Sequence, residues 1–177
     1  MEIRIIDKAS QGDIRLKNEP FALFGRLIPA CREGQWSFRE ELFPEDQISR
    51  MCFPEENYDF DAMAENTVFL GAYDNGMCIG LAILQTAWFR YMYLYDLKVC
   101  ESYRRKGVGA ALMEKAMEVA AERGYRGIYA VCQDNNLGAC RFYLKQDFRI
   151  GGFDNRVYRG TKQEDKADIY FYRDRMD

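Results

Sequence analysis

The stretch from Leu97 to Gly109 constrains the fold of this chain more than any other part of the sequence. A run rich in β-forming residues, 91–99, ends within it, and a basic turn with two glycines then leads into a sequence with helical spacing. The first backbone N–H groups of a helix have no carbonyl partner, and the helix dipole favours negative charge beside them. A strand followed by such a turn and a helix therefore indicates an anion site suited to phosphate. The turn and the start of the helix consist of Arg104, Arg105, Lys106, Gly107, Val108 and Gly109.

The residue types in this turn agree with an anion site. Gly107 and Gly109 have no side chain that would hold a phosphate away from the backbone, and they accept backbone angles that other residues resist. The basic residues add positive charge, and each arginine can offer two parallel N–H donors. The alternative is a solvated basic turn before a helix. The stretch matches neither the Gly-x4-Gly-Lys-Ser/Thr loop of nucleotide hydrolases nor the Gly-x-Gly-x-x-Gly fingerprint of dinucleotide-binding proteins.

Length and composition predict a single domain over residues 1–177. The chain is 48% hydrophobic and 15% aromatic, which is enough to bury one sizeable core. Its net charge of −3 argues against an extended nucleic-acid surface, and an acidic surface would suit a cationic partner. No apolar run is long enough to cross a membrane, and no basic segment at the N-terminus leads into an apolar one. We therefore expect a cytoplasmic protein with neither a nucleic-acid nor a membrane partner.

The chain contains no histidine, and this limits its chemistry. Without histidine and without a Cys-x-x-Cys pair, the common zinc-site patterns are excluded, so we expect no metal and read the six cysteines as reduced thiols. Ser-His-Asp and Cys-His machinery is excluded as well. Proton transfer must then rely on carboxylate, tyrosine, cysteine, lysine or water.

The N-terminal part of the sequence predicts one strand and two helices. Alternating apolar residues predict a strand over 2–7. Helix-like spacing of Phe and Leu predicts a short helix over 21–28, and a second helix is plausible over 36–51. Residues 52–66 are rich in acidic side chains and are interpreted as a loop.

From residue 67 onward the pattern predicts a strand meander followed by alternating helices and strands. Asp74-Asn75-Gly76 is a hairpin-turn signal, and Gly124 stands where a helix C-terminus favours a left-handed residue. Asn136 is suited to cap a helix that runs to residue 146. The predicted strands cover 67–73, 77–88, 91–99, 127–132, 148–153 and 167–172, and the other predicted helix begins at 108.

Two spaced motifs resemble the GNAT family of N-acetyltransferases. The first is Leu97-x-Val99-x4-Arg104-x-x-Gly107-x-Gly109, and the second is Asn136-x-x-Ala139-x-x-Phe142-Tyr143. The resemblance implies an α/β (α+β) fold with a central mixed, mostly antiparallel sheet and about four flanking helices. It also implies acetyl-CoA as co-substrate, with the backbone of the first motif holding its pyrophosphate. The strand residues Leu97 and Val99 would pair with the pantetheine arm and polarise the thioester carbonyl.

The same resemblance assigns roles to residues of the second motif. Tyr143 would sit near the sulfur of coenzyme A and protonate the departing thiolate, and Asn136 would contact the pantetheine. The alternatives are a core aromatic for Tyr143 and a helix cap for Asn136. The family motif normally continues into Gly-Phe, whereas this chain has Asp147 before Phe148. The substitution puts the local turn in doubt but leaves the position of the tyrosine intact.

Acetyl transfer to an amine requires a group that removes a proton from the nucleophile. Asp96 is the leading candidate, because related enzymes often carry an acidic residue in the strand before the first motif. The alternative is a solvent-facing or structural aspartate. The transfer is expected to occur by direct attack, so no acyl-cysteine is required.

The segment around 18–29, together with Trp36-Ser-Phe, is similar to streptothricin acetyltransferases. This similarity implies a polycationic amine as acceptor and antibiotic resistance as the outcome, and such an acceptor calls for an acidic, aromatic pocket. Candidate pocket residues are Glu19, Glu40, Glu41, Asp59, Asp61, Trp36, Tyr58 and Trp88. Another small or protein amine and a non-catalytic acyl-CoA-binding module remain alternatives. An exposed strand edge makes a homodimer possible.

Overall fold

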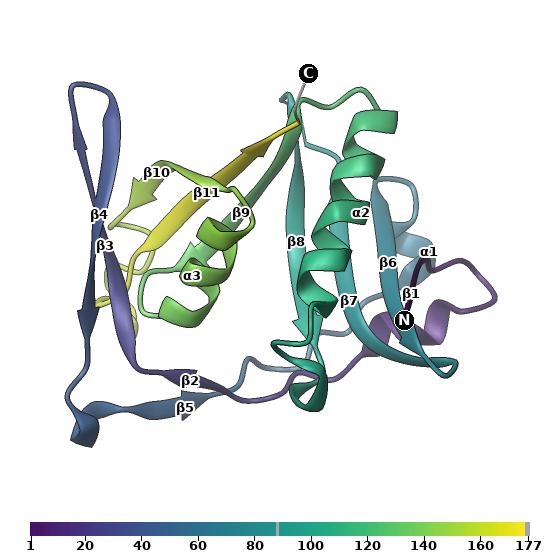
Figure 1. Ribbon diagram of the computed structural model, residues 1–177, viewed down its shortest axis with the longest axis horizontal. Coiled ribbons are helices and arrows are strands. Elements are labelled where there is room, and N and C mark those ends of the chain that lie inside the picture. The colour runs from purple at the N-terminus through teal and green to yellow at the C-terminus, as the bar shows by residue number, and fades with distance from the viewer. Residues whose placement is uncertain (88, 176–177) are drawn as a thin grey trace. The chain divides into compact units, whose positions relative to one another are not determined.

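The computed structural model describes residues 1–87 and 89–175, and its helices and strands are labelled in Figure 1. The chain divides into two units. The first unit comprises Met1–Pro20, Cys52–Ile128 and Asp174–Asp177, and the second comprises Phe21–Met51 and Tyr129–Arg173. The strand order of the sheet is β1 (Glu2–Ile5), β6 (Thr67–Asp74), β7 (Met77–Gln85), β8 (Tyr91–Val99), β9 (Gly127–Gln133), β11 (Asp168–Asp174) and β10 (Arg149–Asp154). β9 begins in the first unit and continues in the second. The expected mixed, mostly antiparallel sheet is confirmed.

In the first unit four strands pair antiparallel, and helices or turns precede and follow them. The strands are β1 (Glu2–Ile5), β6 (Thr67–Asp74), β7 (Met77–Gln85) and β8 (Tyr91–Val99). The helical elements are η1 (Gln11–Arg15), α1 (Phe60–Met63), η3 (Glu101–Tyr103) and α2 (Val108–Glu122). These strands confirm those predicted within 2–7, 67–73 and 91–99, and α2 confirms the helix predicted from 108. The strand predicted over 77–88 is confirmed as far as Gln85, and residue 88 lies outside the described residues.

Two core layers lie on opposite faces of these strands. On one face α2 packs against β7 so closely that a Cβ on Gly80 would lie 3.0 Å from Val108 and 3.1 Å from Leu112. On the other face a hydrophobic cluster joins the strands to η1 and to the segment before α1. Its buried members are Ile6, Ile14, Tyr58, Phe69, Leu81 and Ile83.

A β-bulge in β8 decides which residues face each layer. Asp96 is opposite Ile83 and Leu94 is opposite Leu84, which leaves Tyr95 as an extra residue on β8. Directly opposed residues share a face of a sheet, so the pairing assigns the end of β8 to the two layers. The residues on the α2 side are Leu97, Val99, Gly80 and Ala82, and those on the other side are Asp96, Lys98, Leu81 and Ile83.

The second unit holds the main correction to the sequence predictions. The helices expected over 21–28 and 36–51 are wrong, because these residues form strands and one short 3-10 turn. The elements are β2 (Phe21–Leu23), β3 (Gly25–Arg32), β4 (Gln35–Leu42), η2 (Glu45–Gln47) and β5 (Ser49–Met51). The loop expected over 52–66 contains α1. The described residues therefore contain three α-helices rather than about four.

The error has a physical cause in the turn between β3 and β4. Glu33 and Gly34 both take positive φ angles, 51° and 79°, and they close a hairpin in which Arg32 is opposite Gln35. Pairing across this hairpin favours period-2 burial, so residues Gly25 and Leu27 are buried while Arg26 and Ile28 are partly exposed. A Cβ on Gly25 would lie 2.6 Å from the Glu41 carbonyl oxygen, so glycine allows the strands to approach.

The remainder of the second unit agrees with the sequence. Besides β9 it contains α3 (Leu137–Lys145), β10 (Arg149–Asp154) and β11 (Asp168–Asp174), and β10 pairs antiparallel with β11. These elements confirm the helix predicted to run to 146 and the two closing strands.

Candidate active site

The N-terminus of α2 is built to leave backbone donors open. Gly107 precedes the helix with a left-handed φ of 86°, and no side chain caps it. The first helical hydrogen bond runs from the Ala111 N–H to the Gly107 carbonyl at 3.0 Å, so the N–H groups of Val108, Gly109 and Ala110 have no helical acceptor. The first turn contains no acidic residue. Such a donor set is chemically suited to a phosphate group.

The Arg104 side chain was expected to add positive charge at the anion site, but it is bound to backbone carbonyl groups. Its guanidinium donates to the carbonyls of Val99 at 3.0 Å, Pro20 at 2.6 Å and Glu19 at 3.1 Å. It therefore ties the end of β8 to the segment before β2 rather than projecting freely toward an anion. The exposed Lys106 has its ammonium 5.4 Å from the centre of the Tyr103 ring, and the neighbouring Arg105 is exposed with a φ of 61°.

The backbone of β8 presents Leu97 and Val99 away from β7. The Cys100 N–H donates to the Ile79 carbonyl of β7 at 3.0 Å. Backbone groups alternate along an antiparallel strand, so the N–H and C=O groups of Val99 and Leu97 point to the opposite side. The bond from Arg104 to the Val99 carbonyl agrees with this direction. These two residues thus have the orientation that pairing with an extended ligand needs.

Asp96 lies in a network of charged and polar groups on the face opposite α2. The Tyr58 hydroxyl donates to Asp96 Oδ2 at 2.8 Å, and Lys98 Nζ lies 3.2 Å from the same oxygen. Lys98 also donates to Glu56 at 2.7 Å and to the Leu16 carbonyl at 3.4 Å. The side chains of Lys98 and Asp96 are 8% and 18% exposed, whereas that of Glu56 is 36% exposed.

The two carboxylates of this network have opposite pKa shifts. Burial raises the pKa of Asp96 above its ordinary value, although the charge of Lys98 and the Tyr58 hydrogen bond oppose the shift. Burial also acts to raise the pKa of Glu56, but hydrogen bonds from Lys98 and Asn18 outweigh it and lower the pKa. Burial alone would lower the Lys98 pKa, yet the contacts with Glu56 and Asp96 raise it, so Lys98 remains a cation.

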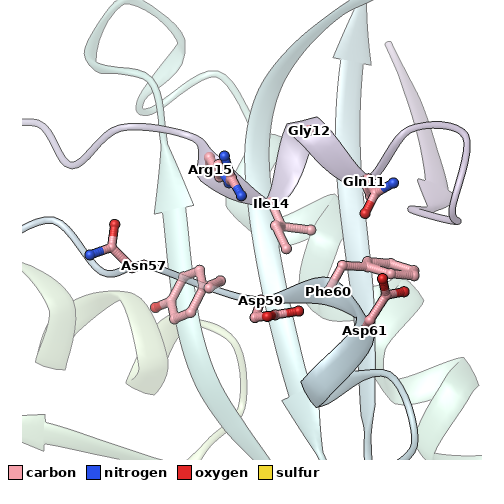
Figure 2. A pocket seen from close by; sticks show the side chains of 9 residues that line it. Gln11, Gly12, Ile14, Arg15, Asn57, Asp59, Phe60 and Asp61 are labelled. Carbon is pink, nitrogen blue, oxygen red and sulfur yellow. The ribbon is translucent and has the colours of Figure 1, made fainter.

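A pocket of about 660 Å³ lies between η1 and the segment leading into α1 (Figure 2). Three of the candidate acidic and aromatic residues line it, namely Tyr58, Asp59 and Asp61. Figure 2 shows the Asp59 and Asp61 carboxylates on this segment, with Arg15 on η1. Asp59 caps α1 by accepting from the Ala62 N–H at 3.1 Å, and Asp61 pairs with Lys8. Both acids therefore already have a local partner.

The lining of this pocket includes none of the other candidate residues that the structure describes. Glu40 pairs with Arg141 at 2.5 Å, and Glu41 lies 3.4 Å from Arg39, within the second unit. Glu19 accepts from the Glu101 N–H. Trp36 is on β4, and Trp88 lies outside the described residues.

In the second unit α3 closes its own N-terminus. The Asn136 side-chain oxygen accepts from the Ala139 N–H at 3.2 Å, which confirms that this residue caps the helix. Tyr143 is 8% exposed, and its ring lies among aromatic neighbours, with centroids 5.3 Å from Phe148 and 5.4 Å from Phe171. Tyr143 is thus part of an aromatic core. Burial of the ring does not prevent the tyrosine hydroxyl from forming a hydrogen bond.

The end of α3 answers the question raised by Asp147. Asp147 takes a left-handed φ of 61°, its N–H donates to the Leu144 carbonyl at 3.3 Å, and the Phe148 N–H donates to the Tyr143 carbonyl at 3.1 Å. These bonds form a Schellman motif. The aspartate therefore occupies the conformation that glycine would have, and the helix end is intact.

Sequence reasoning missed Lys98 and Glu56. The signal for Lys98 was its position two residues after Asp96 on one strand, because alternate residues of a strand share a face. Glu56 lies in the acidic segment 52–66, where nothing local distinguished it from its neighbours.

Two further findings concern the described residues only. They include no group of three His, Cys, Asp or Glu side chains that could hold a metal ion. Across 1–87 and 89–175, no helix is both long and apolar enough to cross a membrane.

Comparison with protein families decides the membership of the chain. The model of the acetyltransferase (GNAT) family matches residues 29–148, a span that includes β8, α2 and α3. The chain belongs to the GNAT family. This membership confirms the resemblance that the two motifs indicated. The chain is therefore an acetyltransferase.

Individual relatives match between 73% and 98% of the chain. Streptothricin acetyltransferase A of Bacillus subtilis (strain 168) is 35% identical over 162 residues, which are 90% of this chain and 92% of that protein. A streptothricin acetyltransferase of Streptomyces lavendulae is 30% identical over 130 residues, covering 73% of this chain and 67% of that one. A crystal structure of a candidate streptothricin acetyltransferase from Bacillus anthracis str. Ames contains acetyl coenzyme A. It matches with a TM-score of 0.88 and 28% identity, over 98% of this chain and 99% of that one.

Proposed function

We propose that this GNAT protein transfers the acetyl group of acetyl-CoA to an amine of streptothricin, on its β-lysine moiety, and thereby confers resistance. The observation that carries the proposal is the 35% identity to a streptothricin acetyltransferase over 90% of the chain. A relative in the same family also holds acetyl coenzyme A in its crystal structure. Localisation in the cytoplasm, where acetyl-CoA is available, belongs to the same proposal.

The first unit supports acetyl-CoA as the co-substrate. The unpaired N–H groups at the start of α2 suit a pyrophosphate, and Lys106 supplies a nearby exposed cation. The outward-facing backbone of Leu97 and Val99 suits the pantetheine arm and would polarise a carbonyl. When bound, acetyl-CoA supplies the activated acetyl group. Arg104 contributes by holding the end of β8 in place, and Arg105 contributes charge.

We assign the general base to Asp96. A protonated amine must lose a proton before it attacks, and a base works best when its pKa is not far below the working pH. Of the two carboxylates in the network, Asp96 has a raised pKa and Glu56 a lowered one. Environments that push two pKa values apart usually separate two roles. Glu56 then serves as the counter-ion of Lys98.

The second unit supplies the proposed general acid. Tyr143 would protonate the departing thiolate, a role taken from the family motif and compatible with its position on α3. The Asn136 side-chain oxygen Oδ1 accepts from the Ala139 N–H, so the side-chain NH₂ is the group proposed to contact the pantetheine. We further propose that both units act as one domain over 1–177, as the length predicts. One cooperative thermal transition that shifts with coenzyme A would support this.

The decisive experiment measures thiol release from acetyl-CoA by the purified protein. Streptothricin is the acceptor, and lysine and spermidine are comparison amines. Turnover on streptothricin with a product heavier by one acetyl group is the expected result. Turnover only on another amine would show that streptothricin is not the acceptor but that the protein does transfer acetyl groups. Coenzyme A binding without turnover on any amine would favour a non-catalytic module. Light scattering of the same sample tests the predicted homodimer.

A further inference from the structure

Lys98 is a buried cation whose contacts the acetyl-transfer chemistry has not yet used. Its side chain is 8% exposed, and a lysine at this depth requires partners for its charge. The three donors of the ammonium face three oxygens: Glu56 Oε2 at 2.7 Å, Asp96 Oδ2 at 3.2 Å and the Leu16 carbonyl at 3.4 Å. Every donor of Lys98 therefore has a partner. The ammonium is held in one place by groups from three segments.

The contacts on Asp96 are concentrated on one oxygen. Both the Tyr58 hydroxyl and the Lys98 ammonium reach Oδ2. Within the part of the chain that the structure describes, no hydrogen bond or ion pair to Oδ1 is observed. Two donors on one oxygen fix the plane of the carboxylate, and the second oxygen remains available to accept a proton. This is the arrangement that a positioned base requires.

We propose that Lys98 is a positioning residue that anchors Asp96 through Oδ2 and keeps the carboxylate ionised, so that Oδ1 receives the proton of the acceptor amine directly or through one water. Tyr58 is the second anchor on the same oxygen. The inference rests on the proposed role of Asp96 as base. In the transfer, an N–H bond of the protonated amine breaks and its proton goes to Oδ1, which frees the nitrogen lone pair to attack the acetyl carbon. The carbon–sulfur bond then breaks, and the departing thiolate is protonated as the nitrogen loses its second proton.

The charged groups around Asp96 make the inference testable in two directions. Lys98 lowers the pKa of Asp96, whereas the charge of Glu56 raises it. Tyr58 and Tyr95, whose ring centroids are 6.1 Å apart, are further ionisable side chains beside Asp96. The elements packed on this face add the charged side chains of Asp13, Arg15, Asp59 and Asp61. Removing the cation should therefore raise the Asp96 pKa, and removing the Glu56 charge should lower it. A side chain that served only to fill space would produce neither shift.

The first experiment measures the Asp96 pKa without using activity. Carboxyl ¹³C NMR titration of the aspartate-labelled full chain follows the Asp96 signal in wild type, Lys98→Met and Glu56→Gln. We expect an upward shift of about one pH unit in Lys98→Met and a downward shift in Glu56→Gln, the size typical of one opposite charge removed from nearby. Lys115→Met is the matched control, because Lys115 pairs with Glu118 on the surface of α2. It should leave the Asp96 signal unchanged.

The second experiment follows the same variants through the pH dependence of kcat/KM. An ionised base is needed, so activity falls as the pH drops through the Asp96 pKa. In Lys98→Met this acid limb should move to higher pH by the shift that NMR measures, and activity at high pH should fall as well, because the carboxylate has lost one of its two anchors. Lys98→Arg keeps the charge and should restore the limb. A purely structural lysine would instead lower activity at every pH without moving the limb.

The two readouts separate failure of this inference from failure of the proposed function. An unchanged Asp96 pKa in both Lys98→Met and Glu56→Gln overturns the positioning role and leaves acetyl transfer intact. A shifted pKa without a shifted acid limb also overturns it, and Asp96→Asn with full activity would then show that the base is a different group. If Lys98→Met does not fold, Glu56→Gln still tests the sign, since Glu56 is 36% exposed.

Discussion

The N-termini of α2 and α3 solve the same physical problem in opposite ways. Each helix begins with N–H groups that lack a helical acceptor. In α3 the Asn136 side chain accepts one of them, from Ala139 at 3.2 Å. In α2 the preceding residue is Gly107, which has no side chain to do so and takes a left-handed φ of 86°. The start of α3 is capped by its own side chain, whereas the start of α2 is left uncapped, as the proposed anion site requires.

The difference teaches where to look for function in each helix. At α2 the backbone itself is the proposed binding group, so the residues that matter for this proposal are those that keep side chains and negative charge away. At α3 the start of the helix is structural, and the proposed chemistry lies two turns further on, at Tyr143. The C-termini also differ in residue type. The left-handed residue that follows α2 is Gly124, with a φ of 77°, whereas the one that follows α3 is Asp147, with a φ of 61°.

The largest expected effect tests the assignment of α3 through its side chain. Tyr143→Phe should lower kcat by about 10²-fold, the lower end of the range for general acid–base groups, because a thiolate is already a tolerable leaving group. The KM for acetyl-CoA should change little. Steady-state thiol release measures both constants. Phe142→Leu, next to Tyr143 on the helix, is the control for packing, and an equal loss of kcat there would argue against a proton-transfer role.

The second prediction tests whether the open start of α2 binds an anion. Ala110→Glu places a carboxylate among the free N–H groups, where it stabilises the helix but competes with phosphate. The KM for acetyl-CoA should rise about tenfold or more relative to the neutral isostere Ala110→Gln, with an equal or higher melting temperature. Equal KM values in the two variants would remove the anion site from this helix. Salt should reduce the difference, because screening weakens the repulsion.

These helices also mark what the sequence could and could not reveal. Spacing and glycine placement predicted α2, its open start and its end at Gly124, because each depends on residues within one or two turns. The Asn-Gly turn after β6 was equally local, with φ angles of 49° and 80° at Asn75 and Gly76. The Glu33-Gly34 turn carries the same positive φ angles but a weaker signal, so the hairpin it closes was interpreted as two helices.

In the candidate site, too, features that depend on nearby residues could be predicted from the sequence, whereas contacts between distant segments could not. Local motifs located Gly107, Asn136 and Tyr143, and strand position located Asp96. The contacts of Asp96 were beyond local reasoning, because its partners come from distant segments: Tyr58 is 38 residues away. Lys98 bonds to Glu56, which is 42 residues away. Nor could periodicity alone reveal the bulge at Tyr95, which assigns Asp96 and Lys98 to the face opposite α2.

The third prediction separates the cap of Asn136 from its proposed ligand contact. Asn136→Ala should lower the free energy of unfolding by about 1 kcal/mol, the usual cost of a lost N-cap. Asn136→Asp keeps the acceptor oxygen and should keep the stability. If the amide NH₂ contacts the pantetheine, the KM for acetyl-CoA should rise a few-fold in both variants. Urea unfolding measures the contribution of the cap, and the KM for acetyl-CoA measures the ligand contact. An unchanged KM in both variants would mean that Asn136 is a helix cap only.

The smallest effect sharpens the comparison of the two helix ends. At Asp147 a side chain occupies a left-handed conformation that costs an L-residue about 1 kcal/mol, although a short polar residue tolerates it better than most. Asp147→Gly should therefore raise the free energy of unfolding by about 0.5 to 1 kcal/mol, less whatever entropy glycine adds to the unfolded chain. The reciprocal Gly124→Asp should destabilise α2 by a similar amount, since it places a side chain in the same conformation. Equal stability of wild type and Asp147→Gly would mean that the aspartate recovers the backbone cost through its own local hydrogen bonding. In that case only Gly124→Asp should retain a measurable effect, and the two ends would differ in side-chain chemistry rather than in backbone strain.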